Sequence, residues 1–273
     1  MSEHDDIETL LDEAEGALDR GDAADAAAFC EQALAVDPGR ADAWMLAGDA
    51  YRDLQQAEQA EQAYRRALGL DSSFAPSAWG ALSGLLFEAL RFEESRGASL
   101  RAIRLDPANP EAHHWRGMLR ERRGDLRGAR RDFRRAHRLD PLGYASPLEL
   151  DDATVESVVE ETLRSLHPQI QDYLQNVAIL LEDVPDEDLC RQWDPPASPA
   201  DILGYFSGSS LRERAADAPW SALPPSIVLF RRNLARIAHD RERMMEELRI
   251  TVFHEIGHFL GLSEEDLEDR GLD

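Results

Sequence analysis

The sequence predicts an all-α repeat solenoid of four helix pairs, followed by a small α+β domain. Three observations support this fold class. Marker residues recur every 34 or 35 positions within residues 1–141. The recurrence stops at residues 142–151, whose composition is typical of a linker. Short apolar runs typical of strands and one long helical pattern then occupy residues 152–273.

The repeat is recognised by positions at which two helices must approach closely. Each repeat ends on an aspartate, and the four aspartates are spaced by 34, 35 and 34 residues. Small residues stand four and eleven positions before each aspartate, and another marks each first helix. Small side chains there let antiparallel helices pack together, and Asp-Pro ends the second helix. The positions are Asp37, Asp71, Asp106 and Asp140; Ala33, Ala67, Ala102 and Ala136; Ala26, Ala60, Ser95 and Ala129; and Ala14, Gly48, Gly84 and Gly117.

This pattern resembles the tetratricopeptide repeat over roughly residues 7–141. The resemblance implies a concave groove that recruits a protein or peptide partner. Family members that clamp a C-terminal carboxylate use Lys and Asn where this chain has Leu11 and Glu15, so a basic or mixed-polarity peptide is expected instead. The alternative is a scaffold without a ligand. The residues expected to face the groove are Glu8, Leu11, Glu15, Asp19, Asp42, Met45, Asp49, Asp53, Ala78, Ala81, His114, Met118 and Arg122.

The second half begins and ends with helical patterns. Apolar residues recur at helical spacing over residues 152–166, and residues 240–262 form one long helical pattern. The Pro- and Asp-rich stretch 184–199 predicts a surface loop. Three short apolar runs predict strands. They are NVAILLED (176–183), ILGYFSG (202–208) and SIVLFRR (226–232).

The long helical pattern carries a metal-binding motif, HEIGH, at residues 254–258. His254 and His258 are four residues apart, so a helix presents both imidazoles on one side, as binding of one Zn²⁺ requires. Glu255 then lies near the open coordination position, where it can take a proton from a metal-bound water. Gly261 can end the helix in a left-handed conformation and turn the chain back toward the metal.

The third metal ligand is expected from the turn that follows the helix. Only fifteen residues follow His258, which leaves no room for a glutamate from a later helix. No methionine follows Met245, so a methionine turn of the metzincin type is absent. A carboxylate is a reasonable zinc ligand. Glu264 is the first choice, with Glu265 and Asp266 as alternatives.

The second half resembles a family of bacterial zincin-like metallopeptidases, over roughly residues 150–267. The segments that carry the resemblance are NVAILLEDVPDE, LGYFSGSSLRER, LPPSIVLFRRNLARIA and RITVFHEIGHFLGLSEEDL. Members usually have Asp at the position of Glu264, which supports a carboxylate ligand. They usually carry a tyrosine where this chain has Phe206, with Tyr205 one residue earlier. The resemblance implies a zincin-like fold and peptidase activity, without a substrate.

Together these features predict a zinc-dependent peptidase in domain 152–273, with the repeat array recruiting a partner or substrate. A metal-bound water activated by Glu255 would attack a peptide carbonyl. His239 and Tyr205 are candidates for the transition-state donor, and SIVLFRR or NVAILLED could bind an extended substrate by strand addition. The alternative is an adaptor protein whose zinc site is structural or catalytically idle.

Composition restricts partners and location. The net charge of −24 argues against nucleic-acid binding. No apolar run is long enough for a membrane span, and the N-terminus lacks the pattern of a secretory signal. Cys30 and Cys190 are far apart and suggest neither a disulfide nor a metal site. A cytoplasmic protein is expected, and the oligomeric state stays open.

Basic residues are concentrated in residues 91–140, from the end of the third repeat through the fourth. All 30 basic residues are arginine, and residues 91–140 carry 14 of them against 8 acids. A stripe recurs at helical spacing along the last repeat helix, and it is either a solvated face or a docking surface for the acidic second half. The stripe consists of Arg127, Arg130, Arg131, Arg134 and Arg138.

Overall fold

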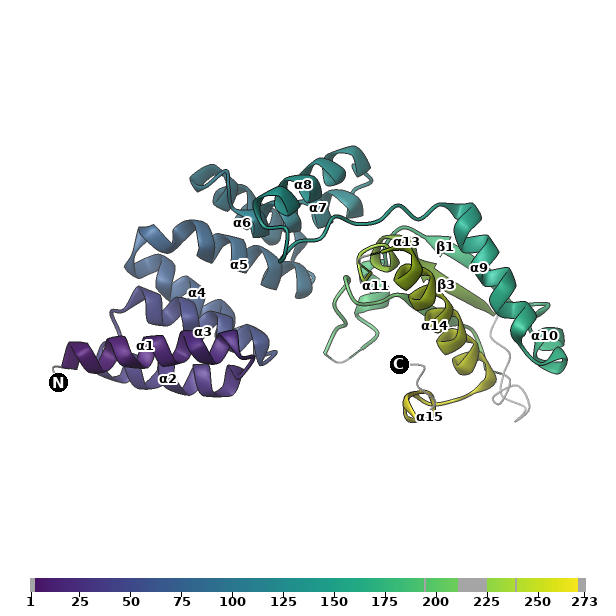
Figure 1. Ribbon diagram of the computed structural model, residues 1–273, viewed down its shortest axis with the longest axis horizontal. Helices are drawn as coiled ribbons and strands as arrows, with labels where there is room; N and C mark the ends of the chain where they lie inside the picture. Colours follow the sequence, from purple (N-terminus) through teal and green to yellow (C-terminus); the bar gives the residue numbers. More distant parts are fainter. Residues whose placement is uncertain (1–2, 194, 211–224, 239, 270–273) are drawn as a thin grey trace. The chain divides into compact units, whose positions relative to one another are not determined.

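The computed structural model describes residues 3–193, 195–210, 225–238 and 240–269. The chain divides into two compact units, Met1–Tyr144 and Ala145–Asp273. The first contains helices only, and the second combines a small sheet with helices (Figure 1). The predicted fold class is confirmed for both halves.

The described part of the first unit consists of four helix pairs joined by short loops (Figure 1). The short 3₁₀ helix η1 (Ser72–Phe74) lies between the second and third pairs. Each helix packs mainly against its partner, and the second helix of each of the first three pairs packs against the first helix of the next pair. The pairs are α1 (Glu3–Asp19) with α2 (Ala23–Val36), α3 (Ala41–Asp53) with α4 (Ala57–Leu70), α5 (Ala75–Glu88) with α6 (Phe92–Leu105), and α7 (Pro110–Arg122) with α8 (Leu126–Leu139).

Two of the recurring glycines lie directly against aromatic rings. A Cβ atom on Gly48 of α3 would stand 2.5 Å from the Tyr64 ring of α4. A Cβ on Gly117 of α7 would stand 2.7 Å from the Phe133 ring of α8. Both rings are buried, so neither can move aside without opening a cavity. The predicted close approach of the two helices in each pair is confirmed at these positions.

The third pair achieves the same close packing with a different side chain. Ser99 of α6 stands at the position that Tyr64 has in α4 and Phe133 has in α8. The space over Gly84 is filled instead by the indole of Trp115 from α7, which lies 2.5 Å from a Cβ built on Gly84. The neighbouring Ser95 is buried, and its hydroxyl donates a 2.6 Å hydrogen bond to the carbonyl of Ser83. The departures from the repeat pattern are therefore compensated by the next helix pair and by a satisfied hydrogen bond.

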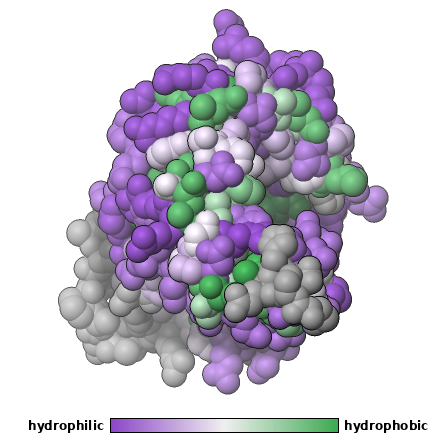
Figure 2. Space-filling model, turned by 90° about the vertical axis from the view of Figure 1, so that its left-hand side faces the viewer, coloured by the Kyte–Doolittle hydropathy of each residue, from purple (hydrophilic) through white to green (hydrophobic). Residues whose placement is uncertain are grey.

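The predicted lining of the repeat groove is wrong at four positions. Leu11, Ala78, Ala81 and Met118 are buried, with at most 7% of their surface exposed. They pack between helices instead of facing a ligand. The polar residues of the predicted set are exposed or half-buried. On the face of the first repeats seen in Figure 2, hydrophilic residues predominate and hydrophobic ones form small separate patches.

The described part of the second unit contains a three-stranded sheet in the order β1-β3-β2. Strands β1 (Ala178–Glu182) and β3 (Ser226–Phe230) run parallel, and β2 (Gly204–Ser207) is antiparallel to β3. Because β3 is paired on both sides, SIVLFRR has no open edge, and strand addition there is excluded. The strand also ends at Phe230, and helix α13 (Arg231–Leu234) follows at once.

Helices account for most of the remaining described residues of this unit. The predicted helices 152–166 and 240–262 are confirmed as α9 (Asp152–Ser165) and α14 (Arg241–Leu260). Helix α10 (Pro168–Leu174) was not predicted, and the expected loop 184–199 contains the single-turn helix α11 (Glu187–Cys190). The last helix is α15 (Glu264–Glu268).

One hydrophobic core joins α9 and α14 to the sheet. It is formed where the alternating side chains of β3 meet the apolar face of α14, and it is closed by α9. Buried members include Val155, Val158, Ile227, Leu229, Leu248, Val252, Ile256 and Phe259. This core fixes the helix that carries the HEIGH motif against the sheet.

Both cysteines, Cys30 and Cys190, are buried and form no disulfide with each other. Within the described ranges, no helix is at once long and apolar enough to cross a bilayer.

Candidate metal centre

Helix α14 begins at a capped end and buries one face. The side chain of Asp240 accepts a 2.8 Å hydrogen bond from the backbone N–H of Arg243, which satisfies one of the free donors at the helix start. Leu248, Val252 and Ile256 recur at a spacing of four and face the core. This burial leaves the two histidines of the motif at the edge of the packed face, where they are half-buried.

The helix ends as predicted at Gly261. This residue has φ 91° and ψ 25°, a left-handed conformation that glycine adopts without steric cost. Its N–H donates a 3.0 Å hydrogen bond to the carbonyl of His258, and the N–H of Leu262 donates a 3.0 Å hydrogen bond to the carbonyl of Gly257. The chain then reverses, and Ser263 begins α15. This reversal carries Glu264 back toward the histidines.

His254, His258 and Glu264 come together around one point. The Nε2 atoms of the two histidines are 3.0 Å apart. Glu264 Oε2 lies 3.5 Å from Nε2 of His254, and Oε1 lies 3.3 Å from Nε2 of His258. Among the described residues they form a group of potential ligand atoms that all lie within 4.8 Å of one another.

The other two candidate acids are arranged differently. Asp266 forms a capping box with Ser263: it accepts a 3.1 Å hydrogen bond from the backbone N–H of Ser263 and donates its own N–H to the Ser263 hydroxyl at 3.2 Å. Glu265 does not belong to the cluster of potential ligands. The structure therefore brings Glu264 to the histidines. The Ser263–Asp266 spacing is a capping signal in the sequence, and it assigns Asp266 to the helix start.

A close contact between two helices positions Glu264. A Cβ atom on Gly257 would collide with the side chain of Leu267, which is fully buried. The absence of a side chain at Gly257 therefore lets α15 lie directly on α14. Neither residue was identified from the sequence. A glycine inside a helix lowers helix stability by about 1 kcal/mol relative to alanine. Its presence within the HEIGH motif is therefore a sequence signal that another element packs closely against the helix there.

Glu255 is buried beside the two histidines, with 5% of its surface exposed. Burial raises its pKa to about 8, the nearby Glu264 carboxylate adds to the rise, and a hydrogen bond from the backbone N–H of Phe206 opposes it. Its Oε2 atom is buried without a hydrogen-bond partner among the described residues. A cation bound by the histidines would favour the carboxylate form.

Strand β2 lies against the motif helix. A Cβ on Gly204 would stand 2.9 Å from Thr251 Cγ2 and 3.3 Å from Glu255 Cγ, so glycine is what lets the strand approach. Two residues further, Phe206 packs edge-on against Phe259 of α14, with ring centroids 5.8 Å apart.

Of the two candidate donors for a transition state, Tyr205 is not brought to this site. Side chains alternate along a strand, so Tyr205 lies on the opposite face of β2 from Phe206. There it packs with Leu189, Val228 and Phe230. His239 lies outside the described residues. The sequence therefore predicted the cluster of potential ligands, but not the placement of Tyr205.

The donor set fits a zinc ion. Two imidazole nitrogens and a carboxylate oxygen are typical zinc ligands, and ligand atoms about 2.1 Å from a tetrahedral ion are separated by roughly 3.4 Å. The two Nε2 atoms are 3.0 Å apart, and each lies 3.3 or 3.5 Å from a different oxygen of Glu264, so the separations are of this order. With three protein ligands, a tetrahedral ion would keep one position for water, as in catalytic rather than structural sites. The Oε2 atom of Glu255, the residue after His254 on the same helix, is a buried acceptor without a partner among the described residues.

Comparison with protein families agrees with this geometry. A family described as zincin-like metallopeptidase matches residues 174–272. Tetratricopeptide repeat families match residues 17–85 and 110–142. The chain combines tetratricopeptide repeats with a zincin-like domain. The zincin-like match includes the sheet, the HEIGH motif and α15, and the repeat matches lie in the all-helical unit.

No curated protein matches the chain. Solved structures with similarity include a MamA crystal structure, with 18% identity, a TM-score of 0.41, and coverage of 58% of this chain and 86% of that chain. Another is YrrB, described as a TPR protein with an unusual peptide-binding site, with 23% identity, a TM-score of 0.40, and coverage of 57% and 76%. A third is pilF of Pseudomonas aeruginosa, with 18% identity, a TM-score of 0.46, and 99% coverage of both chains. Similarities at this level carry no functional argument.

Proposed function

We propose that this chain is a zinc-dependent peptidase whose repeat array recruits a protein partner or substrate. The observation that carries the proposal is the cluster of His254, His258 and Glu264 with the buried, unpartnered Oε2 atom of Glu255 beside it. A purely structural zinc site would be closed by a fourth protein ligand and would not need this carboxylate.

His254, His258 and Glu264 would hold the metal. Zinc, when bound, would supply a water of lowered pKa and polarise a peptide carbonyl. Glu255 would accept a proton at Oε2 and later deliver it to the leaving amine. Its burial keeps competing water away from that oxygen, and the hydrogen bond from Phe206 fixes the orientation of the carboxylate.

An extended substrate would bind along β2. This strand has no second strand partner in the described part of the sheet, and Gly204 brings its backbone against Glu255. Strand addition would place a peptide carbonyl beside the metal-binding residues, with affinity from main-chain hydrogen bonds. The repeat array would supply a separate protein contact, for which its acidic groove residues favour a basic or mixed-polarity segment. The cytoplasmic location stays a prediction.

The test combines metal analysis with proteolysis of an unbiased peptide library, read by mass spectrometry. Four proteins are compared: wild type, Glu255→Gln, Glu264→Gln and the matched control Glu265→Gln, which changes an acid of the same turn outside the cluster. We expect Glu255→Gln to keep its zinc and to cleave about 10²–10⁴-fold more slowly, because a general base is lost. Glu264→Gln should lose zinc, and Glu265→Gln should behave as wild type.

The same experiment separates the peptidase from the adaptor alternative. Stoichiometric zinc with no difference in cleavage between wild type and Glu255→Gln would favour an adaptor with an idle metal site. Zinc binding that survives in a His254→Ala, His258→Ala double variant would contradict the ligand assignment itself.

A further inference from the structure

A small pocket in the repeat array is lined by four arginines and two leucines. It lies between α6 and α7, has a volume of about 190 Å³, and is bounded by Arg96, Leu100, Arg116, Leu119, Arg120 and Arg123. None of these residues belongs to the set predicted to face the groove, which in this repeat consists of His114, Met118 and Arg122. The pocket is therefore a second surface, distinct from the expected groove.

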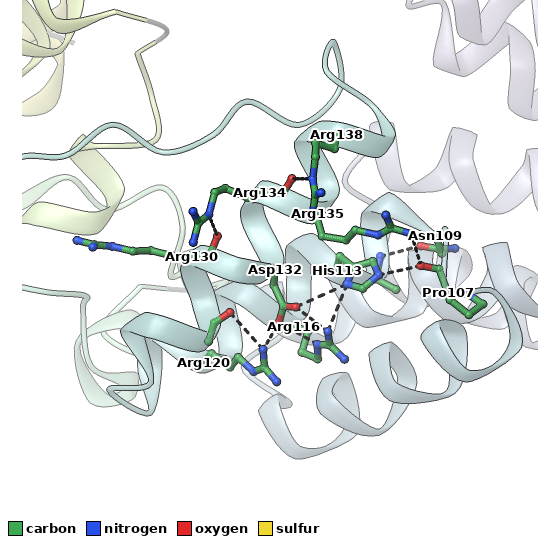
Figure 3. A network of polar contacts seen from close by, with 12 residues as sticks. Pro107, Asn109, His113, Arg116, Arg120, Arg130, Asp132, Arg134, Arg135 and Arg138 are labelled. Carbon is green, nitrogen blue, oxygen red and sulfur yellow. Dashed lines mark hydrogen bonds and ion pairs between the residues drawn. The ribbon is translucent and has the colours of Figure 1, made fainter.

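A buried carboxylate holds two of the arginines in place. Asp132 of α8 accepts hydrogen bonds from Arg116 at 2.6 and 2.8 Å and from Arg120 at 2.8 Å, and its side chain is only 4% exposed. Figure 3 shows both guanidinium groups reaching Asp132 from α7, whereas Arg130 and Arg138 extend away from it. One acid thus orders two cations at the pocket wall.

The other two arginines repeat this arrangement at the rim. Glu93 of α6 binds Arg96 of the same helix at 3.0 Å and also Arg123 of α7. Asp125, which caps α8, lies 3.6 Å from Arg120. Four guanidinium groups therefore meet three carboxylates, within a stretch of the sequence that is itself strongly basic. The pocket carries an excess of positive charge on a chain with a net charge of −24.

The four arginines also keep donors that the protein does not use. Nη1 of Arg96, Nη1 of Arg116, Nη2 of Arg120 and Nη1 of Arg123 have no hydrogen-bond partner in the described ranges. A guanidinium group that is already held by one carboxylate is preorganised to bind a second carboxylate, because the planar group loses little further conformational freedom when it does so. The floor between them is apolar: Leu100 is 38% exposed, and Leu119 is buried beneath.

We propose that this pocket binds an acidic protein segment in which a leucine-type side chain is flanked by carboxylates. The apolar residue would cover Leu100, and the carboxylates would bind the unused guanidinium donors of the rim. Nucleic acid fits less well, because a continuous phosphate backbone would be repelled by the acidic remainder of the chain and does not use an apolar floor. The proposal depends on neither the metal site nor peptidase activity.

The test is a fluorescence-anisotropy titration of the full chain with a fluorescein-labelled peptide of sequence Gly-Glu-Asp-Leu-Glu-Asp-Gly. The key variant is Arg96→Gln, Arg123→Gln, since both side chains are about half exposed and bind only the exposed Glu93. The matched control is Arg104→Gln, Arg127→Gln, which makes the same charge change at exposed positions of α6 and α8 outside the pocket. Arg116 and Arg120 stay unchanged, because they neutralise a buried acid.

We expect the wild type and the control to bind within twofold of each other, and the pocket variant to lose about tenfold or more in affinity. Leu100→Asn, or replacement of the peptide leucine by asparagine, should weaken binding several-fold. Higher salt should weaken it as well. Circular dichroism confirms that each variant is folded.

Three results would overturn the proposal. The peptide could fail to bind the wild type, or it could lose affinity equally in the pocket variant and the control, which would indicate non-specific attraction. A single-stranded RNA oligonucleotide could also bind more tightly than the peptide and lose this binding in the pocket variant, which would assign the surface to nucleic acid.

Discussion

Close packing at glycines follows one repeated pattern in the helical array and takes a different form at each place in the zincin-like domain. In the array, Gly48 faces Tyr64, Gly117 faces Phe133, and Gly84 faces Trp115, so nearly the same contact recurs along the chain. In the described part of the zincin-like domain, Gly257 admits the buried Leu267 where α15 lies on α14, and Gly204 admits Thr251 where β2 lies on the same helix. The glycine–aromatic contacts of the array each stabilise one part of the repeat stack, whereas the contact of Gly257 with Leu267 can position one functional residue, Glu264.

The two regions also differ in how they use buried acids. In the array, Asp132 is surrounded by arginines. Burial alone would raise its pKa, but hydrogen bonds from His113 and Arg116 hold the pKa below its ordinary value. In the zincin-like domain, no cation among the described residues lowers the pKa of Glu255, and burial raises it to about 8. The first acid is suited to structure, and the second to proton transfer.

Asp132→Ala should have the largest effect on stability. Removing the carboxylate leaves Arg116 and Arg120 partly buried without their partner, which typically costs about 3–5 kcal/mol. The free energy of unfolding from urea denaturation, followed by circular dichroism, measures the loss. Glu93→Ala is the matched control, because this acid also binds two arginines but is 68% exposed, so its loss should destabilise the protein far less. Equal effects of the two variants would contradict the assigned role of burial.

The pH dependence of unfolding tests the same contrast. Because the folded-state pKa of Asp132 is lowered, its contribution is present above the unfolded pKa of about 3.9 and is lost as the pH falls through the folded value. Asp132→Ala should therefore flatten the acid side of the stability profile. An acid limb identical to that of the wild type would show that Asp132 does not contribute to it.

Gly48→Ala should have the next largest effect. The added Cβ would lie 2.5 to 3.0 Å from three atoms of the Tyr64 ring, which is fully buried and hydrogen-bonded to Asp49 at 2.7 Å. Overpacking of this kind costs about 1–3 kcal/mol, despite the better helix propensity of alanine. The midpoint of urea unfolding should fall. An unchanged midpoint would mean that α3 and α4 can move apart to admit the methyl group without loss of stability.

Gly257→Val should affect metal binding more than overall stability. The side chain would push Leu267, and with it α15 and Glu264, away from the two histidines. We expect zinc affinity to fall by about tenfold or more, measured by competition with a chromogenic chelator. A change in the thermal midpoint without a change in zinc affinity would contradict a positioning role for this contact.

Gly97→Ala should have the smallest effect, and in the opposite direction. A Cβ on Gly97 of α6 would meet nothing within 4 Å. The substitution should stabilise the array by about 0.5–1 kcal/mol through helix propensity alone. This variant is also the control for Gly48→Ala, since both make the same chemical change. A loss of stability here would indicate a contact at this position that the fold does not explain.

Much of the candidate site could be predicted because its ligands are close together in the sequence. The i, i+4 spacing of the histidines, the left-handed Gly261 and the choice of Glu264 all depend on local helix geometry. What could not be predicted involves distant segments. The proximity of Phe206 to Glu255, and the placement of Tyr205 on the other sheet face, depend on how β2 packs against α14.

The sequence by itself determined the four helix pairs, the division into a repeat array and an α+β domain, and the residues able to bind a metal. Each of these follows from spacing within a helix or from repetition at a fixed period. Only the tertiary structure decided the strand order β1-β3-β2, the burial of Leu11 and Met118, and the contact of Gly257 with Leu267. These depend on which surfaces meet after the chain folds, and no local pattern records that choice.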